Sequence, residues 1–463
     1  MTMLDVQIEE HFIDFIQVND QTGKGLTEAL LAKLETLGLD INDCRGQGYD
    51  NGANMKGLRQ GVQAHVLHLN PRAYFMPCGC QSLNLVLGDM AKSCPKAMTF
   101  FGIAQRVYAT FAGSPNRWEI LRNRVPYLTL KPLSETRWEC RVESVKAICY
   151  QTSDIVDALL EVGAESKDPK TKSEANSLAN ETQDFELILS TVIWYDVLFA
   201  VNTVSKTLQS SDMQLDVALA QLDGLIDFIE KYRDNGFVSA KVAATDIALG
   251  MDIEPVLKSA RRIKRKQDIY QNEYIPDAEQ VYVTDYFLVI VDQALTALRT
   301  RFTEMQKFGQ TFGFVFDVKK LRDMEEGELR RRCAGLSDAL NTTEYQDVNT
   351  QDLFQELRIL REMIPKEADT ALKTLRFLKR IEGTFPNCEV ALRLVLTVPV
   401  TVASGERSFS KLKLIKTYLR STMSQDRLCR LALLSIEKDV TCRLRYDDLI
   451  AEFVAKKARK VKF

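Results

Sequence analysis

The first residue with clear chemical potential is an aspartate at the junction between a predicted strand and a predicted helix. Asp50 lies in the stretch GQGYDNGANM, residues 46–55. Its carboxylate would lie at the carboxyl end of the strand, where open α/β sheets assemble their sites. There it could bind a divalent metal ion for phosphoryl transfer. The same residues allow a second interpretation, in which Asp50 and Asn51 form an Asx turn or cap a helix.

A second acid lies far along the chain. Glu406 belongs to the stretch SGERSFS, residues 404–410. Taken alone, this pattern is typical of an exposed acid in the first turn of a helix, where the helix dipole favours a negative charge.

Cysteine and histidine offer few metal ligands. The ten cysteines are scattered, with only Cys78 and Cys80 close together, and there are three histidines. A structural zinc site usually needs two paired-ligand clusters. A disulfide framework is typical of short secreted chains with dense cysteines. We therefore expect free, mostly buried thiols.

Two basic clusters could contact phosphate groups, although the net charge is −2. Such clusters neutralise phosphates or act as nuclear address signals. A solvated helix face or a frayed tail explains them equally well. One cluster lies in the tail, residues 456–462. The other supplies the candidate DNA-contacting residues Arg261, Arg262, Lys264, Arg265 and Lys266.

The elements that would position the N-terminal residues alternate in type. Hydrophobic patterns predict strands, interspersed with helices of apolar residues at helical spacing. This order favours a partly parallel sheet with crossover helices. The predicted strands are 8–18, 43–49 and 74–77, and the predicted helices are 26–38 and 81–90.

From about residue 140 the pattern becomes helical, with few prolines. At the end of the chain, an apolar stretch precedes Pro399, and two further helices follow. The predicted helices are 141–164, 178–208, 212–234, 284–307, 350–363, 366–381, 404–418 and 424–438.

Composition restricts the class of protein. The chain is 45% hydrophobic and 27% charged, as in a folded globular protein. No run approaches the roughly 18 apolar residues of a membrane helix, so we expect no membrane partner. The acids Asp5, Glu9, Glu10 and Asp14 exclude a secretory signal peptide, which predicts a cytosolic or nuclear protein.

Several ordered segments resemble the hAT superfamily of transposases, in particular the branch with the MYM-type zinc-finger proteins. The last of them resembles the hAT C-terminal dimerisation region. The segments are CRGQGYDNGANMKG, MPCGCQSLNLVLGDM, SPNRWEILRN, LKPLSETRWECRVESVKAI and VPVTVASGERSFSKLKLIKTYLRSTMSQDRLCRLALLSI.

The resemblance implies an RNase H-like catalytic domain interrupted by a long helical insertion, which makes a mixed α/β fold with a large all-α part. We expect an incomplete RNase H-like domain over 1–140, the helical insertion over 141–380, the dimerisation region with the last RNase H-like helix over 381–450, and a basic tail over 451–463.

The resemblance also implies site residues. Asp50 corresponds to the second catalytic aspartate and Glu406 to the glutamate, which in the intact family help to bind a pair of Mg²⁺ ions. We expect their carboxylates within about 10 Å of each other, because paired metal ions lie about 4 Å apart. Trp138, next to Arg137, is a candidate for stacking on an unpaired base. A structural tryptophan at a domain junction is the alternative.

Two departures put catalysis in doubt. The first aspartate of the family would lie upstream of residue 8, so we expect a truncated sheet that lacks one ligand. In addition, Gln81 replaces the histidine of the family's Cys-x-x-His pattern that begins at Cys78, and glutamine is no imidazole ligand. We therefore expect no functional metal and no enzyme activity.

The sequence as a whole predicts a nuclear protein, derived from a hAT transposase, that forms dimers or higher oligomers with itself and could bind DNA. Two alternatives stay open. One is an active transposase that lacks its first exon, and the other is a nuclear scaffold whose helices bind other proteins.

Overall fold

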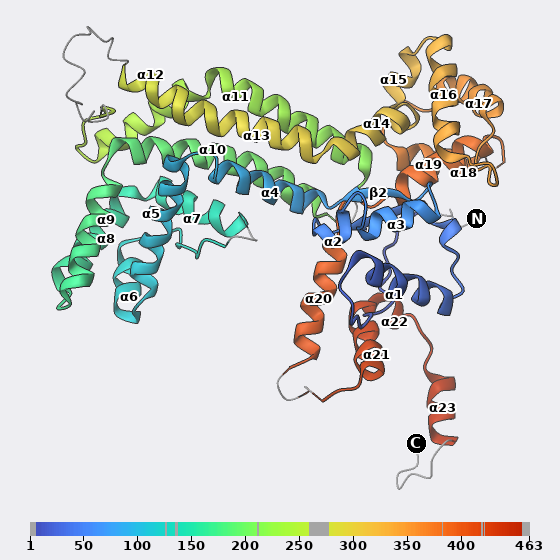
Figure 1. The fold of residues 1–463 in the computed structure, drawn as a ribbon, viewed down its shortest axis with the longest axis horizontal. Helices are drawn as coiled ribbons and strands as arrows, with labels where there is room; N and C mark the ends of the chain where they lie inside the picture. Colours follow the sequence, from blue (N-terminus) through green and yellow to red (C-terminus); the bar gives the residue numbers. More distant parts are fainter. Residues whose placement is uncertain are drawn as a thin grey trace.

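The computed structural model describes residues 6–125, 127–134, 138–210, 213–258, 277–381, 383–417, 420 and 422–455. The described chain is mostly helical, with a small parallel sheet near the N-terminus. Long helices form one extended layer, and smaller groups of helices project from it (Figure 1).

The N-terminal region combines short elements around the sheet. Residues 8–18, predicted as a strand, form no regular secondary structure and pair with no strand in the described part of the chain, so that prediction is wrong. The predicted helices 26–38 and 81–90 are confirmed as α1 and α4. The elements are α1 (Gly23–Thr36), the 3-10 helix η1 (Ile41–Asp43), β1 (Gly46–Tyr49), α2 (Ala53–Lys56), α3 (Val62–Leu69), β2 (Tyr74–Pro77) and α4 (Gly79–Ala91).

The two strands are parallel, as the alternating order predicts. Gly46 pairs with Tyr74 and Tyr49 with Pro77, so that both strands end at the same edge. A segment from the far end of the chain crosses β1. A Cβ atom on Gly48 would lie 2.7 Å from Pro399 Cγ, so the strand requires glycine for this close approach.

The helices that follow form the body of the molecule. The prediction of 350–363 coincides with α17, whereas 178–208 and 284–307 are each broken into separate helices. The helices are α5 (Pro95–Ala112), α6 (Pro115–Arg124), α7 (Trp138–Tyr150), α8 (Thr152–Glu165), α9 (Pro169–Thr182), α10 (Phe185–Leu208), α11 (Leu215–Gly250), α12 (Ala278–Tyr282), the π-helical turn η2 (Val283–Phe287), α13 (Leu288–Arg301), α14 (Thr303–Phe316), α15 (Val318–Asp323), α16 (Glu326–Leu340), α17 (Thr350–Met363), α18 (Ala371–Arg380) and α19 (Pro386–Thr397).

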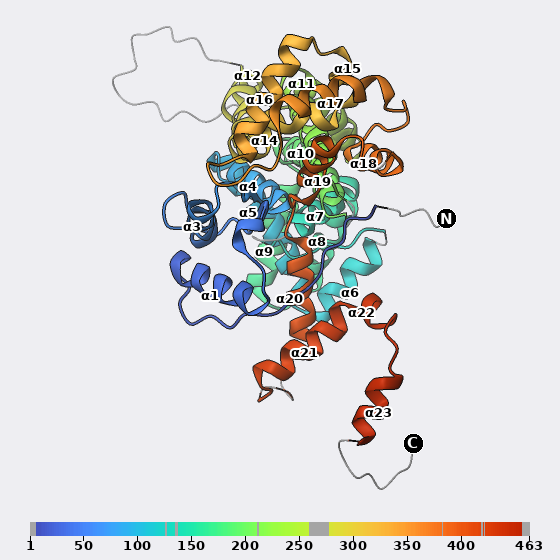
Figure 2. The same cartoon turned by 90° about the vertical axis from the view of Figure 1, so that its right-hand side faces the viewer.

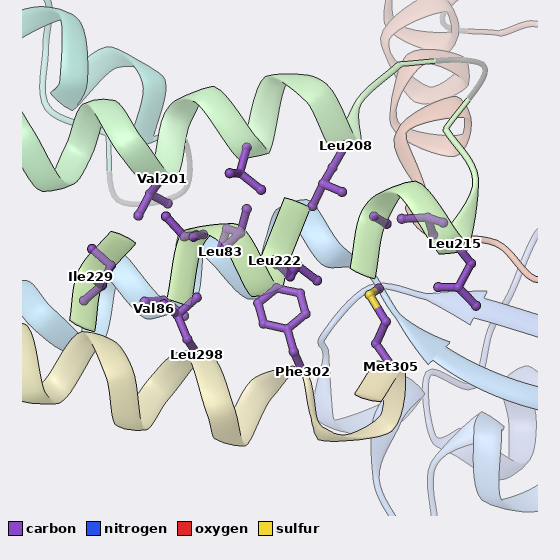
Figure 3. Packing of buried hydrophobic residues seen from close by; sticks show 14 of the residues in the cluster. Leu83, Val86, Val201, Leu208, Leu215, Leu222, Ile229, Leu298, Phe302 and Met305 are labelled. Carbon is purple, nitrogen blue, oxygen red and sulfur yellow. The ribbon is translucent and has the colours of Figure 1, made fainter. Parts of the chain in front are cut away.

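The main core lies where α4, α10, α11 and α13 pack side by side. Leu83 from α4, Leu222 from α11 and Leu298 from α13 point into the same interior, and the ring of Phe302 points into it between Leu298 and Met305 (Figure 3). Side chains of this size contribute about 1.5–3 kcal/mol each when fully buried. This core fixes α4, and therefore the N-terminal end of α4, relative to the body.

Two helical segments have the length and hydropathy of membrane spans, which the sequence analysis did not anticipate. They are Phe185–Leu208 and Ala278–Arg301, and their apolar windows are 61% and 50% buried inside the protein. Both helices belong to the main core, and that burial accounts for their apolar composition.

The C-terminal helices project from the body in both views (Figures 1 and 2). They are α20 (Ala403–Ile415), α21 (Gln425–Ile436), α22 (Lys438–Thr441) and α23 (Asp447–Ala455). The predictions 404–418 and 424–438 agree with α20 and α21 within a few residues at their ends.

Candidate functional site

The candidate site lies where β1 and β2 end. Asp50 follows β1 directly, and Cys78 follows β2 directly. Because the two parallel strands end at the same edge of the sheet, Asp50 and Cys78 follow paired residues and lie at that edge. The helix α4 begins there, with Gly79 as its first residue.

Gln81 holds the loop after β1 against α4. Its side-chain Oε1 accepts a hydrogen bond of 2.5 Å from the Asn51 backbone N–H. The Asn51 side-chain amide donates in turn to Ser82 Oγ at 3.2 Å. The glutamine at this position therefore has a structural role, because it fixes the residue next to Asp50.

Asp50 forms an Asx turn. The carboxylate is exposed, and its Oδ1 accepts a hydrogen bond of 3.1 Å from the Gly52 backbone N–H. This bond is the one expected in the turn interpretation of the motif.

Glu406 follows the segment of Pro399 and Val400, which contacts β1 and the start of α4. The Gly79 backbone N–H donates to the Val400 carbonyl oxygen at 3.1 Å, which joins this segment to the start of α4. The helix α20 begins three residues later, at Ala403, and Glu406 lies exposed in its first turn.

A cavity of about 800 Å³ connects these elements. Glu406, Gln81 and Cys78 all line it. Gln81 thus contacts the neighbour of Asp50 on one side and faces the Glu406 cavity on the other. The expected separation of about 10 Å between the two carboxylates stays a prediction.

The thiols of Cys78 and Cys80, which line the cavity, are held in their neutral form. Burial raises the pKa of Cys80 to about 12, with smaller contributions from Cys78 and Glu406. Burial likewise raises the pKa of Cys78, and Glu406 contributes in the same direction. Neutral buried thiols are poor nucleophiles and poor metal ligands.

The residues described here do not fit a pair of metal ions. Over the described ranges, no group of three or more His, Cys, Asp and Glu side chains could hold a metal. Asp50 is engaged in its turn, and Gln81 supplies an amide where the family pattern has an imidazole. These residues therefore support no chemical step through Mg²⁺.

The structure places Trp138 inside the protein. The side chain is 3% exposed, with its ring 5.6 Å from the Phe101 ring and 4.1 Å from the Arg141 guanidinium carbon. These contacts fit a structural tryptophan at the start of α7. Trp138 also lines the cavity that Gln81 and Glu406 line, and its stacking on a base stays a prediction. Arg137 lies outside the described residues, and so do Arg261, Arg262, Lys264, Arg265 and Lys266.

The C-terminal apolar residues divide into two sets. Those of α19 are buried in the body, for example Leu392 and Val395. In α20 only Ser408 is buried, and in α21 only Leu428 and Ala432. The paired helices α20 and α21 therefore carry large apolar side chains that stay exposed in the described chain: Phe409, Leu414, Leu433 and Leu434.

The N-terminal segment packs against these two helices, which the sequence analysis missed. The Phe12 backbone N–H donates to Glu437 Oε1 at 2.5 Å, and the Phe15 carbonyl oxygen accepts from Gln425 Nε2 at 2.7 Å. The Phe15 ring lies 5.3 Å from that of Phe409. The aromatic residues of segment 8–18 indicated contact with another part of the chain, but not that the partner is a helix, and they are only partly buried.

Comparison with known proteins adds two family matches. Residues 351–440 match the model of the hAT family C-terminal dimerisation region. Residues 3–61 match the ZMYM1/FAM200 RNase-like domain. The first match contains α20 and α21, and the second contains β1 and Asp50.

The chain is also similar to two curated proteins, the human and the mouse "52 kDa repressor of the inhibitor of the protein kinase". Both are 23% identical to it, over 466 and 471 residues. Each alignment covers 94% of this chain and 58% of the relative. The chain therefore spans somewhat more than half the length of these relatives.

Proposed function

Because this chain is a hAT transposase-derived protein that carries the family's C-terminal dimerisation region, we propose that it acts by self-association through α20 and α21. The observation that supports this most directly is the set of exposed apolar side chains on the two helices. Leu414 is 70% exposed and Leu434 is 53% exposed. Isolated exposed leucines are ordinary, but a group on paired helices is typical of an interaction surface.

The free energy of burying these side chains is sufficient for association with a second copy of this chain. Burying one such side chain contributes about 1.5–3 kcal/mol. In a two-fold interface each side chain is used twice, once from each copy. A few leucines and one phenylalanine can therefore offset an association cost of about 4–15 kcal/mol.

We further infer that β1, β2, the start of α4 and the start of α20 belong to one RNase H-like domain, which the helices between them interrupt. The contact between Gly79 and Val400 and the crossing of Pro399 over β1 support this assignment. The RNase-like match over residues 3–61 supports it independently.

We also propose a nuclear location with contact to DNA through the basic cluster of residues 258–266. The concentration of lysine and arginine in the sequence supports this part. Replacing its arginines and lysines by alanine should move a fluorescently tagged chain out of the nucleus and weaken retention on immobilised DNA. An unchanged location and unchanged retention would contradict it.

Light scattering after gel filtration tests self-association. We expect twice the chain mass of 52.6 kDa for the natural chain and the monomer mass for a Leu414→Glu, Leu434→Glu double variant. Leu249→Glu is the matched control, because Leu249 is 60% exposed and lies at the C-terminal end of α11, a helix of the body. Circular dichroism verifies that each variant is folded. A monomeric natural chain, or a double variant that stays dimeric, overturns the proposal.

A further inference from the structure

A groove of about 640 Å³ is lined by residues of α10 and α11 and shares no lining residue with the cavity at Glu406. The two helices are joined by a short connection, so they run antiparallel, and they pack closely against each other. Gly224 of α11 lines the groove, and a Cβ atom there would meet nothing within 4 Å. The groove is therefore open where this glycine lies.

Four aromatic rings line the groove, two from each helix. Tyr195 and Phe199 lie one helical turn apart on α10, with ring centroids separated by 5.8 Å. Phe228 and Tyr232 lie one turn apart on α11 and stack at 5.9 Å. Phe199 is 53% exposed and Phe228 is 41% exposed, so their ring faces are available to a ligand.

One carboxylate accompanies these rings. Asp196 lines the groove and accepts a hydrogen bond of 3.0 Å from the Tyr232 hydroxyl. Burial raises the pKa of this carboxyl, which reflects the cost of its charge in this position. No lysine, arginine or histidine of the described ranges forms an ion pair with Asp196, so its charge is not balanced there.

We propose that this groove binds a methylated ammonium group, with Asp196 supplying the opposite charge and the exposed rings of Phe199 and Phe228 contacting the methyl groups. Ring faces attract a cation through their quadrupole. An unmodified ammonium is strongly hydrated and would lose hydrogen bonds with water that the rings cannot replace. Methyl groups remove that loss and add apolar surface, which suits a groove with rings around a single acid.

The charge also distinguishes this ligand from a neutral apolar group. An uncharged group would leave Asp196 further desolvated without a counter-ion, which is unfavourable. A quaternary ammonium compound and a trimethylated lysine side chain share the required chemistry. They differ in what surrounds the cation, and the experiment separates them.

Titration of the full chain, followed by ligand-observed NMR, tests the proposal. The probes are choline and a short peptide with a central trimethyllysine. The controls are the choline isostere in which a tert-butyl group replaces the trimethylammonium group, and the same peptide with unmodified lysine. We expect both methylated cations to bind better than their controls. Tighter binding of the peptide would identify a protein side chain as the natural ligand, and tighter binding of choline a small molecule.

Three variants assign the binding to the groove. Phe199→Leu should weaken it by about three- to thirty-fold, the range for the loss of one cation–π contact. Asp196→Asn should abolish the preference for the cation over the neutral isostere. Tyr127→Leu is the matched control, because Tyr127 is 87% exposed and does not line the groove. Equal binding of cation and isostere, no binding of either probe, or equal loss in the control variant would each overturn the proposal.

Discussion

Replacing Asp347 by alanine should loosen the connection between the N-terminal region and the helical body. Asp347 precedes α17 and binds two arginines of the N-terminal region. Its carboxylate accepts from Arg45 Nε at 2.7 Å and from Arg45 Nη2 at 2.8 Å, and it also accepts from Arg72 Nη1 at 2.9 Å. Removal of the carboxylate leaves both guanidinium groups without their counter-ion.

The magnitude follows from burial. The side chain of Arg72 is 3% exposed, and those of Arg45 and Asp347 are 16% and 13% exposed. Loss of one partner from a buried pair costs about 3–5 kcal/mol. Because Arg45 and Asp347 retain some contact with solvent, we expect the lower end, about 3 kcal/mol.

Hydrogen exchange is the suitable assay, because a chain of this size need not unfold in a single step. We expect amides of β1 and of residues 341–348 to exchange about a hundred-fold faster in the alanine variant. Asp347→Asn should give a smaller effect, because the amide oxygen still accepts a hydrogen bond.

Glu28→Ala is the matched control. Glu28 pairs with Lys24 at 3.8 Å, and both side chains are largely exposed. Such a pair contributes well under about 1 kcal/mol. If Asp347→Ala changes exchange no more than Glu28→Ala does, the reasoning on this buried cluster is refuted.

Three further predictions concern other contacts. Hydrogen bonds with Glu437, then Glu9, raise the pKa of His11. The contact of segment 8–18 with α21 should therefore be strongest below the ordinary histidine pKa of 6.5 and should weaken as the pH rises through the raised value. Protease cleavage within the segment measures this contact, and His11→Ala should remove its pH dependence in that range. Gly48→Ala should destabilise the chain by about 1–3 kcal/mol, because the added methyl group would clash with Pro399. Gly102→Ala places its methyl group in open space on α5 and should stabilise the chain by about 0.5–1 kcal/mol. Denaturant titration measures the free energy of unfolding of both variants. Purified chain should not nick supercoiled plasmid with Mg²⁺ or Mn²⁺, and cleavage that disappears in Asp50→Ala would contradict this expectation.

Local patterns predicted local structure well. The apolar spacing of residues 350–363 coincides with α17, because an amphipathic helix is specified by its own residues. Segment 8–18 has the β-branched and aromatic residues of a strand, yet it forms no regular element and contacts α21. Some of its apolar residues stay exposed, for example Ile13 at 53%, because a strand also needs a neighbouring strand, which sequence propensity does not specify.

Helix length and distant contacts were harder to predict. The prediction of 212–234 ends sixteen residues before α11 does, because the second half of the helix packs through alanines such as Ala240, Ala244 and Ala248, which give a weak hydrophobic pattern. The link between Asp347 and Arg45 joins residues 302 positions apart, and nothing in either local sequence indicates it. The motif at Asp50 did predict a strand end, and the role of Gln81 beside it became clear only from its hydrogen bond.

The contact between Gly79 and Val400 has a consequence for synthesis on the ribosome. The strands β1 and β2 emerge about 320 residues before the segment that covers them, which at about 5–20 residues per second corresponds to roughly 15–65 seconds. During that interval the glycine-lined face of β1 that Pro399 contacts is uncovered, and partly folded chains of this kind are prone to aggregate. The chain therefore depends on the helices between, which can pack as they emerge, to bring Pro399 back before a neighbouring nascent chain reaches β1.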